Sequence, residues 1–153
     1  MQPVELVAYS DYLCPWCFNA SVRLWRLQDE MPGTVEIAFK SFLLRPEPNP
    51  NRSLEKFRAY THSWMRPAED PDGGSFRVWE GDAGPPTHSV PPHLVAKAAA
   101  SIDRASFRRV HERLLHAYFA ESRDISAPDT LVELWAEAGL PAEELARVAD
   151  PAH

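Results

Sequence analysis

The chain contains two cysteines, Cys14 and Cys17, which stand three positions apart in the segment SDYLCPWCF. The apolar run VELVAY precedes this segment, and the residues from Pro15 onward have the apolar spacing of a helix. Cys14 is therefore expected at the first turn of a helix that follows a strand, where unpaired backbone N–H groups and the helix dipole favour a thiolate. Cys17 lies about one turn later, so it can face Cys14 and close a small disulfide ring. This spacing predicts thiol–disulfide exchange, in which the Cys14 thiolate attacks a substrate disulfide and Cys17 resolves the mixed disulfide.

Two neighbouring residues have types that suit this position. Pro15 fits the first helical turn because it lacks an N–H group that would have no partner there. Asp11 stands three residues before Cys14. It either accepts a proton during exchange or is a turn residue at the approach to the helix, and the turn is favoured because aspartate is common in turns.

A structural zinc site is the main alternative chemistry for two cysteines at this spacing. Zinc in proteins usually takes four ligands, and the chain has no second cysteine pair. Its histidines include His88, His93, His111 and His116. Each of these two pairs is five positions apart, which is not the spacing that shares a helix face. Two inert core thiols are the other alternative. The sequence predicts redox chemistry with no metal and no bound cofactor.

Residues 1–45 are predicted to form a β-α-β unit. Val4–Tyr9 is the first strand, apolar on both faces as in a buried strand. A helix follows over about 15–31, and a second strand begins at Val35 with alternating apolar residues. Because the crossover is a short helix, the two strands are expected to be parallel neighbours.

Residues 46–153 are predicted to form a linker, a long loop and a helical domain, which together make a single compact unit. The loop over 66–92 is rich in proline and glycine, with SFRVWE as an edge strand inside it. Within the loop, Phe76 and Trp79 are candidates for a lid over the substrate. Four other aromatic residues lie on helical apolar stripes and are expected in the core: Trp25, Trp64, Tyr118 and Trp135.

Helix starts and stops in this second part are predicted from short signals. Ser53 is expected to cap one helix, and the segment from Ser126 to Asp129 has the spacing of a capping box. Gly139 is expected to end the helix that follows, with a last helix from about Pro141. His88 and His93, which flank the start of another helix, are expected to cap it or to face solvent.

Composition excludes several classes of protein. The chain has 153 residues, 44% of them hydrophobic and 25% charged, as in one soluble domain with a core. Its net charge of −6 gives no general attraction for nucleic acid or anionic lipid. No run approaches the roughly 20 apolar residues of a membrane span, and the first residues do not resemble a secretory leader. We therefore expect a cytoplasmic protein with no nucleic-acid or membrane partner.

The segment SDYLCPWCF resembles the active-site segment of the DsbA-like thioredoxin family, in particular its FrnE-like branch. FLLRPEPNP resembles that family's exit from the second strand, and HSVPPHLVAKAAA with RLLHAYFAESRDISAPDTLVELWAEAGL resembles its helical insertion. The resemblance implies a thioredoxin-like α/β fold with a helical insertion domain. It implies that Cys14 is the nucleophile, that Cys17 is the resolving cysteine, and that Trp16 tunes the redox poise and covers the pair. Pro15, Trp16 and Asp11 are expected to face the substrate. The substrate would be a disulfide or thiol of a protein or small molecule.

One departure from the family concerns the C-terminal part of the fold. The family continues after the insertion with a cis-proline loop, two antiparallel strands and a final helix, whereas this sequence ends at VADPAH. We expect these strands to be missing from the chain, which leaves an unpaired sheet edge. The sheet would be completed by a continuation of the chain, by a homodimer or by a partner's strand.

Two other functions stay open at this stage. The first is a glutathione-dependent or polyketide-type small-molecule isomerase of the same fold. Isomerases of the 2-hydroxychromene-2-carboxylate kind typically carry serine where Cys14 stands, which argues against them. The second is a non-catalytic binding module, favoured by the missing C-terminal part.

Overall fold

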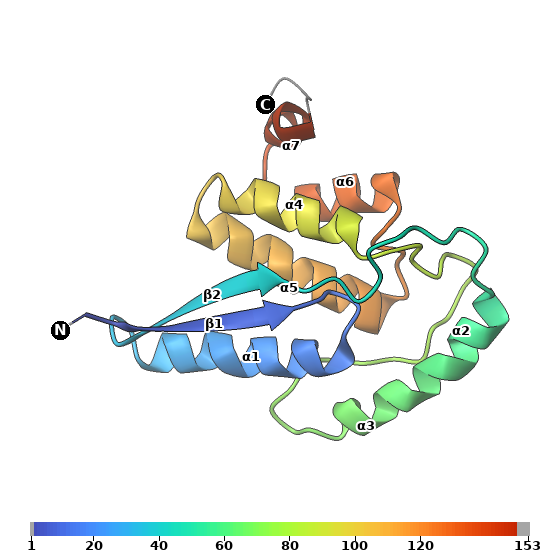
Figure 1. The fold of residues 1–153 in the computed structure, drawn as a ribbon, viewed down its shortest axis with the longest axis horizontal. Coiled ribbons are helices and arrows are strands. Elements are labelled where there is room, and N and C mark those ends of the chain that lie inside the picture. Colours follow the sequence, from blue (N-terminus) through green and yellow to red (C-terminus); the bar gives the residue numbers. More distant parts are fainter. Residues whose placement is uncertain (1, 150–153) are drawn as a thin grey trace.

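The structure, a computed structural model, describes residues 2–149. Its strands and helices follow one another as drawn in Figure 1. They are β1 (Val4–Ser10), α1 (Pro15–Glu30), β2 (Val35–Ser41), α2 (Leu54–Thr61), a 3-10 turn (His62–Trp64), α3 (Met65–Ala68), α4 (Val90–Ala100), α5 (Arg104–Glu121), α6 (Pro128–Glu137) and α7 (Ala142–Ala149). None of these described helices is both long and apolar enough to cross a bilayer.

The predicted β-α-β unit is confirmed. β1 and β2 are parallel, with a register that runs from Val4 opposite Val35 to Ser10 opposite Ser41. Both strands point toward the end of the sheet where α2 lies (Figure 1). The carboxyl end of β1 therefore delivers the chain directly to the first turn of α1, which carries the two cysteines.

The expectation that β1 is buried on both faces was wrong. Val7 is 43% exposed and Tyr9 66% exposed. The register explains this, because Tyr9 pairs with Lys40 on one face of the sheet while Ala8 pairs with Phe39 on the other. The helices cover only the Phe39 face. Within residues 2–149, β1 has one neighbouring strand, so completion of the sheet in trans or by a longer chain stays a prediction.

Helices α1 and α5 pack together against the covered face of β2. The ring centroid of Phe39 lies 5.1 Å from that of Trp25 on α1 and 4.4 Å from that of His111 on α5. A continuous hydrophobic core extends from these helices into the rest of the chain. Four aromatic side chains were predicted to be buried, and all are at most 6% exposed: Trp25, Trp64, Tyr118 and Trp135. The last three belong to this continuous core, whereas Trp25 packs against Phe39 outside it.

Trp79 belongs to this core, so its predicted place in a lid over the substrate was wrong. It is 2% exposed, its Nε1 donates to the carbonyl oxygen of Ala83 at 2.9 Å, and its ring meets that of Phe57 edge-on at 5.0 Å. Burial of so large a ring makes the loop part of the folded core rather than a cover.

The predicted edge strand SFRVWE does not form, because its backbone groups pair with helices and side chains. The N–H of Arg77 donates to the carbonyl oxygen of Phe119 at 2.8 Å. The N–H of Trp79 donates to Thr61 Oγ1 at 3.0 Å, and that of Glu80 to Ser122 Oγ at 2.8 Å. These bonds hold the loop extended across the helical core without a strand partner.

Capping follows the sequence at one helix and departs from it at another. Ser53 caps α2 as predicted, with its Oγ accepting from the N–H of Lys56 at 3.2 Å. The predicted capping box at Ser126 was wrong, since Ala127 is the N-cap of α6 and Ser126 Oγ donates to Asp124 Oδ1 at 2.6 Å. Gly139 follows the end of α6 with a φ of +79°, a conformation that favours glycine.

Candidate active site

Cys14 and Cys17 lie at the N-terminus of α1, as their spacing predicted. Cys14 is the N-cap residue, with extended backbone angles, and Pro15 occupies the first helical position. The Cys14 Sγ accepts a hydrogen bond from the N–H of Cys17 at 3.3 Å. Both thiols are reduced and half-buried. Cys14 thus takes the place that serine or aspartate takes in most helix caps, with its sulfur turned toward the free N–H groups of the first turn.

The environment lowers the pKa of Cys14 to about 6. A hydrogen bond from the Cys17 thiol is the largest cause. The backbone N–H groups of Cys17 and Trp16 act in the same direction, against partial burial and the negative charge of Asp11. Because the thiolate is the attacking species in exchange, Cys14 is prepared to act as a nucleophile at neutral pH.

The environment acts in the opposite direction on Cys17. Its hydrogen bond to Cys14, its burial and the nearby negative charges raise the pKa of its thiol far above the ordinary value. Cys17 therefore stays protonated while Cys14 is a thiolate.

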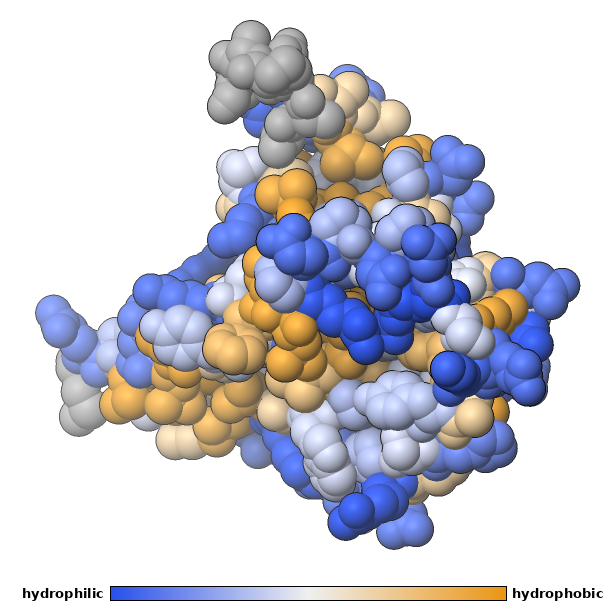
Figure 2. All heavy atoms as spheres, turned by 45° about the vertical axis from the view of Figure 1, so that its right-hand side comes forward, coloured by the Kyte–Doolittle hydropathy of each residue, from blue (hydrophilic) through white to orange (hydrophobic). Residues whose placement is uncertain are grey.

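Trp16 lies between the two cysteines and is 53% exposed. The chain after β2 brings more exposed apolar residues, with Phe42 60% and Leu44 52% exposed. Figure 2 turns this end of the molecule forward and shows hydrophobic areas beside strongly hydrophilic ones. The substrate-facing role of Trp16 and Pro15 stays a prediction that this exposure supports.

Asp11 does not face the substrate, contrary to the expectation for this residue. It is 2% exposed and accepts three hydrogen bonds. The donors are the N–H of Leu13 at 3.0 Å, the N–H of Leu44 at 2.6 Å and the hydroxyl of Ser89 at 2.7 Å. The bond to Leu13 is the turn interaction that the sequence suggested. The other two tie the cysteine turn to the exit of β2 and to the start of α4.

His93 lies beside this carboxylate and is buried, so the expectation that it caps a helix or faces solvent was wrong. Its Nδ1 is 2.8 Å from Ser41 Oγ, and its Nε2 is 3.5 Å from Asp11 Oδ1. Burial alone would raise the pKa of Asp11, but the nearby imidazole and the three hydrogen bonds outweigh it and hold that pKa below its ordinary value. Asp11 is therefore a buried carboxylate that stays charged.

A second buried polar group lies on the other side of the cysteine turn. His111 Nδ1 is 2.8 Å from the hydroxyl of Tyr12, and its Nε2 is 2.7 Å from Ser21 Oγ. Burial lowers the pKa of His111 to about 3, so its ring is neutral. This interaction fixes the turn to α1 and α5. Sequence reasoning missed it because Tyr12 and His111 are 99 positions apart.

Residues 2–149 contain no cluster of three or more histidine, cysteine, aspartate or glutamate side chains placed to hold a metal ion.

A sequence model of the DSBA-like thioredoxin domain family matches residues 5–152. The chain belongs to this family. The thioredoxin-like α/β fold expected from the resemblance is confirmed, and so is the DsbA-like family itself. The membership supports oxidoreductase activity in general terms.

Solved structures and a curated relative are similar to this chain. The cytosolic disulfide reductase DsbM from Pseudomonas aeruginosa superposes with a TM-score of 0.74 at 25% identity, over 97% of this chain and 72% of that one. Another structure of that reductase contains GSH and superposes with a TM-score of 0.72 at 23% identity, over 97% of this chain and 73% of that one. A probable DsbA oxidoreductase from Streptomyces coelicolor gives a TM-score of 0.70 at 26% identity, over 97% of this chain and 68% of that one. The uncharacterized protein YwbO of Bacillus subtilis is 26% identical over 144 residues, which span 90% of this chain and 67% of that protein.

The shifted pKa of Cys14 leads to a direct expectation for its reactivity. The rate of alkylation at Cys14 should rise as pH increases and reach half of its maximum near pH 6. Cys17 should react slowly over the same range because its pKa is raised. Iodoacetamide labelling of the reduced protein at a series of pH values, with peptide mass spectrometry to separate the two sites, measures both. Equal labelling of the two thiols, with a common midpoint near the ordinary value of about 8.5, would contradict this asymmetry.

Proposed function

We propose that the chain is a thiol–disulfide oxidoreductase that exchanges disulfides through Cys14 and Cys17. The observation that carries the proposal is the pair of opposed pKa shifts at the first turn of α1, which makes one thiol reactive and holds the other protonated. Membership in the DSBA-like thioredoxin domain family supports it independently.

The exchange needs no cofactor. The Cys14 thiolate attacks one sulfur of a substrate disulfide, forms a mixed disulfide and releases the other sulfur as a thiolate, which takes up a proton. Cys17 then loses its proton and attacks the Cys14 sulfur, so that the second substrate thiol leaves and an intramolecular disulfide forms. The substrate gains two electrons and two protons, and the protein dithiol loses them.

A small thiol is the proposed electron donor that restores the dithiol. Two glutathione molecules would reduce the Cys14–Cys17 disulfide and leave as glutathione disulfide. The neighbouring P. aeruginosa protein is named a cytosolic disulfide reductase, and one of its structures contains GSH. On the same ground we propose a cytoplasmic location and the reducing direction. The C-P-W-C spacer and FLLRPEPNP support the FrnE-like branch.

The formation of a reversible disulfide between the two cysteines tests this proposal. Mild oxidation of the protein should remove two hydrogen atoms per chain and protect both thiols from alkylation, and dithiothreitol should restore both. Intact-mass spectrometry before and after alkylation measures the change. The Cys17→Ser variant is the control, because it cannot form the intramolecular bond. Full alkylation of both thiols in the oxidised wild-type protein would refute the proposed function.

A further inference from the structure

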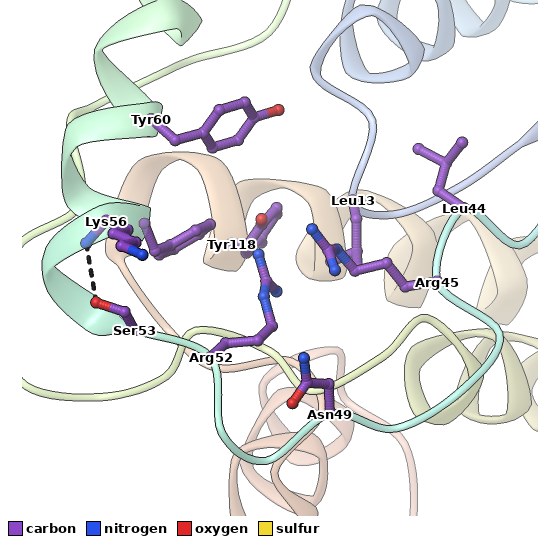
Figure 3. Close-up of a pocket in the computed structure, with 10 residues that line it drawn as sticks. Leu13, Leu44, Arg45, Asn49, Arg52, Ser53, Lys56, Tyr60 and Tyr118 are labelled. Atoms are coloured by element: carbon purple, nitrogen blue, oxygen red, sulfur yellow. Dashed lines mark hydrogen bonds between the residues drawn. The ribbon is translucent and has the colours of Figure 1, made fainter.

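A cavity of about 660 Å³ lies next to the cysteine turn, between the chain that leaves β2 and the helix α2 (Figure 3). Leu13, the residue directly before Cys14, forms part of its wall. The lining residues are Leu13, Leu44, Arg45, Asn49, Arg52, Ser53, Lys56, Phe57, Tyr60 and Tyr118. Three of them are cations and none is an acid. The mechanism described above uses none of these three cations.

The guanidinium groups of Arg45 and Arg52 both point into this space in Figure 3. Arg52 Nη1 donates to the carbonyl oxygen of Pro86 at 2.5 Å, and its guanidinium carbon lies 5.2 Å from the centroid of the Phe57 ring. These contacts hold Arg52 in place without neutralising it. Burial, together with the charge of Arg45, lowers the pKa of Arg52, as expected for like charges close together.

The cavity cations differ from most other arginines of the chain in lacking a carboxylate partner. Nine arginines form ion pairs with aspartate or glutamate: Arg23, Arg26, Arg58, Arg77, Arg104, Arg108, Arg113, Arg123 and Arg147. In the part of the chain that the structure describes, no such pair involves Arg45, Arg52 or Lys56. Asp124 acts on Arg52 through space, but its Oδ1 accepts from Ser126. A chain with net charge −6 therefore leaves three cations unpaired around one cavity.

An unneutralised cluster of this kind attracts anions and suits carboxylates, which arginine binds through parallel N–H donors. The rest of the cavity wall offers both polar groups and apolar surface, which suits the uncharged part of a small peptide. Asn49 and Tyr60 offer polar groups, while Leu13, Phe57 and Tyr118 offer apolar surface. The volume is that of a small-molecule site rather than of a folded partner. Leu13 connects this cavity to the cysteine turn, since the next residue along the chain is Cys14.

We propose that this cavity binds the carboxylates of a small acidic thiol, of which glutathione is the type, and presents its sulfur to Cys14. The delivery of the sulfur to Cys14 rests on the proposed function, whereas binding of the carboxylates can be measured separately. Arg45, Arg52 and Lys56 are then binding residues that select anionic thiols and disulfides over neutral ones.

Binding of S-methylglutathione tests the site without chemistry, because its blocked sulfur cannot exchange while both carboxylates remain. Calorimetric titration into the reduced protein should give saturable binding that weakens at high salt. The diethyl ester of the same compound should bind at least about 10-fold more weakly, because both of its carboxyl groups are esterified and carry no charge. The Arg45→Gln/Lys56→Gln double variant should lose the preference for the acid over the ester. Both replaced side chains are exposed, so folding should not depend on them.

The Arg66→Gln variant is the matched control. Arg66 is exposed and does not line the cavity, so this change removes a positive charge elsewhere and should keep the preference. Absence of S-methylglutathione binding, or equal binding of acid and ester by the wild-type protein, would overturn the inference.

A parallel measurement follows oxidation of the dithiol by bis(2-hydroxyethyl) disulfide, which is neutral. Oxidation by this reagent without acid-selective binding would reject the cavity assignment and keep the proposed function. Acid-selective binding without any oxidation of the dithiol would support the cavity assignment and reject the proposed function.

Discussion

Replacing Cys14 by serine is expected to lower the rate of disulfide exchange by about 10³-fold or more. A serine hydroxyl is not ionised near neutral pH and does not attack disulfides, so the step that begins the reaction is lost. The remaining Cys17 is a poor substitute, because it is half-buried and burial still raises the pKa of its thiol after the hydrogen bond with the Cys14 thiolate is lost. Reduction of a fluorescent disulfide peptide, with dithiothreitol as the electron donor, measures the loss.

The Cys17→Ser variant separates the two roles. It should still attack through Cys14 but stop at the mixed disulfide, so it should accumulate a covalent adduct with the peptide that Cys14→Ser does not form. Non-reducing electrophoresis and intact mass detect this adduct. Equal trapping by the two variants would show that the thiols are not asymmetric and would contradict the assignment of nucleophile and resolving cysteine.

Both variants are expected to keep the fold. Serine is a favoured N-cap residue, so replacing Cys14 keeps an acceptor for the N–H groups at the start of α1. The volume change at both positions is small. Circular dichroism and thermal melting of both variants should therefore match the wild-type protein, and this comparison is the control for the exchange assay.

The β-α-β unit and its cysteines could be predicted because their signals are local. An apolar run leads into Cys14, Pro15 suits the first turn of α1, and alternating apolar residues mark β2. Each signal involves residues a few positions apart, and the hydrogen bonds within α1 follow the same short range. The two sulfurs therefore lie where their spacing placed them.

Predictions about the long loop failed because its contacts are distant in sequence. Trp79 packs against the ring of Phe57, and its backbone N–H donates a hydrogen bond to Thr61 Oγ1. The composition of the loop reveals neither contact. Proline and glycine in that segment predicted irregular structure correctly, but not whether it is buried. The exposure of Tyr9 has a similar cause, because a strand pattern does not tell how many faces the helices cover.

The role of Asp11 illustrates the same limit within the site. Its turn bond to Leu13 spans two residues and could be expected, whereas Leu44 and Ser89 are 33 and 78 positions away. No local pattern joins these donors to one carboxylate. The cavity cations were missed because Arg45 and Lys56 line one cavity only after α2 folds back beside the chain that leaves β2.

Replacing Asp11 by alanine should destabilise the protein by on the order of 3 kcal/mol, because two buried donors and one partly buried donor lose their acceptor together. Asp29→Ala is the matched control. Asp29 pairs with Arg108 at 2.7 Å, but its side chain is 55% exposed and the pair is screened by solvent, so its loss should destabilise the protein much less. Urea unfolding of the two variants at neutral pH measures the difference. A loss for Asp11→Ala no larger than that for Asp29→Ala would contradict the view that this carboxylate holds the site together.

The same carboxylate sets a pH dependence whose sign follows from its lowered pKa. The folded protein holds the charged form of Asp11 more strongly than the unfolded chain does, where the pKa is about 3.8. Its contribution to stability is therefore complete well above pH 3.8 and is lost as the pH falls through the folded pKa. The free energy of unfolding of the wild-type protein should decline in this acid range, and the Asp11→Ala variant should show a shallower decline.

Removing the charge of Asp11 should also lower the pKa of Cys14 below about 6, because Asp11 opposes the ionisation of that thiol. A variant that is less stable yet has a more acidic nucleophile would show that Asp11 holds the turn in place at some cost to thiolate formation.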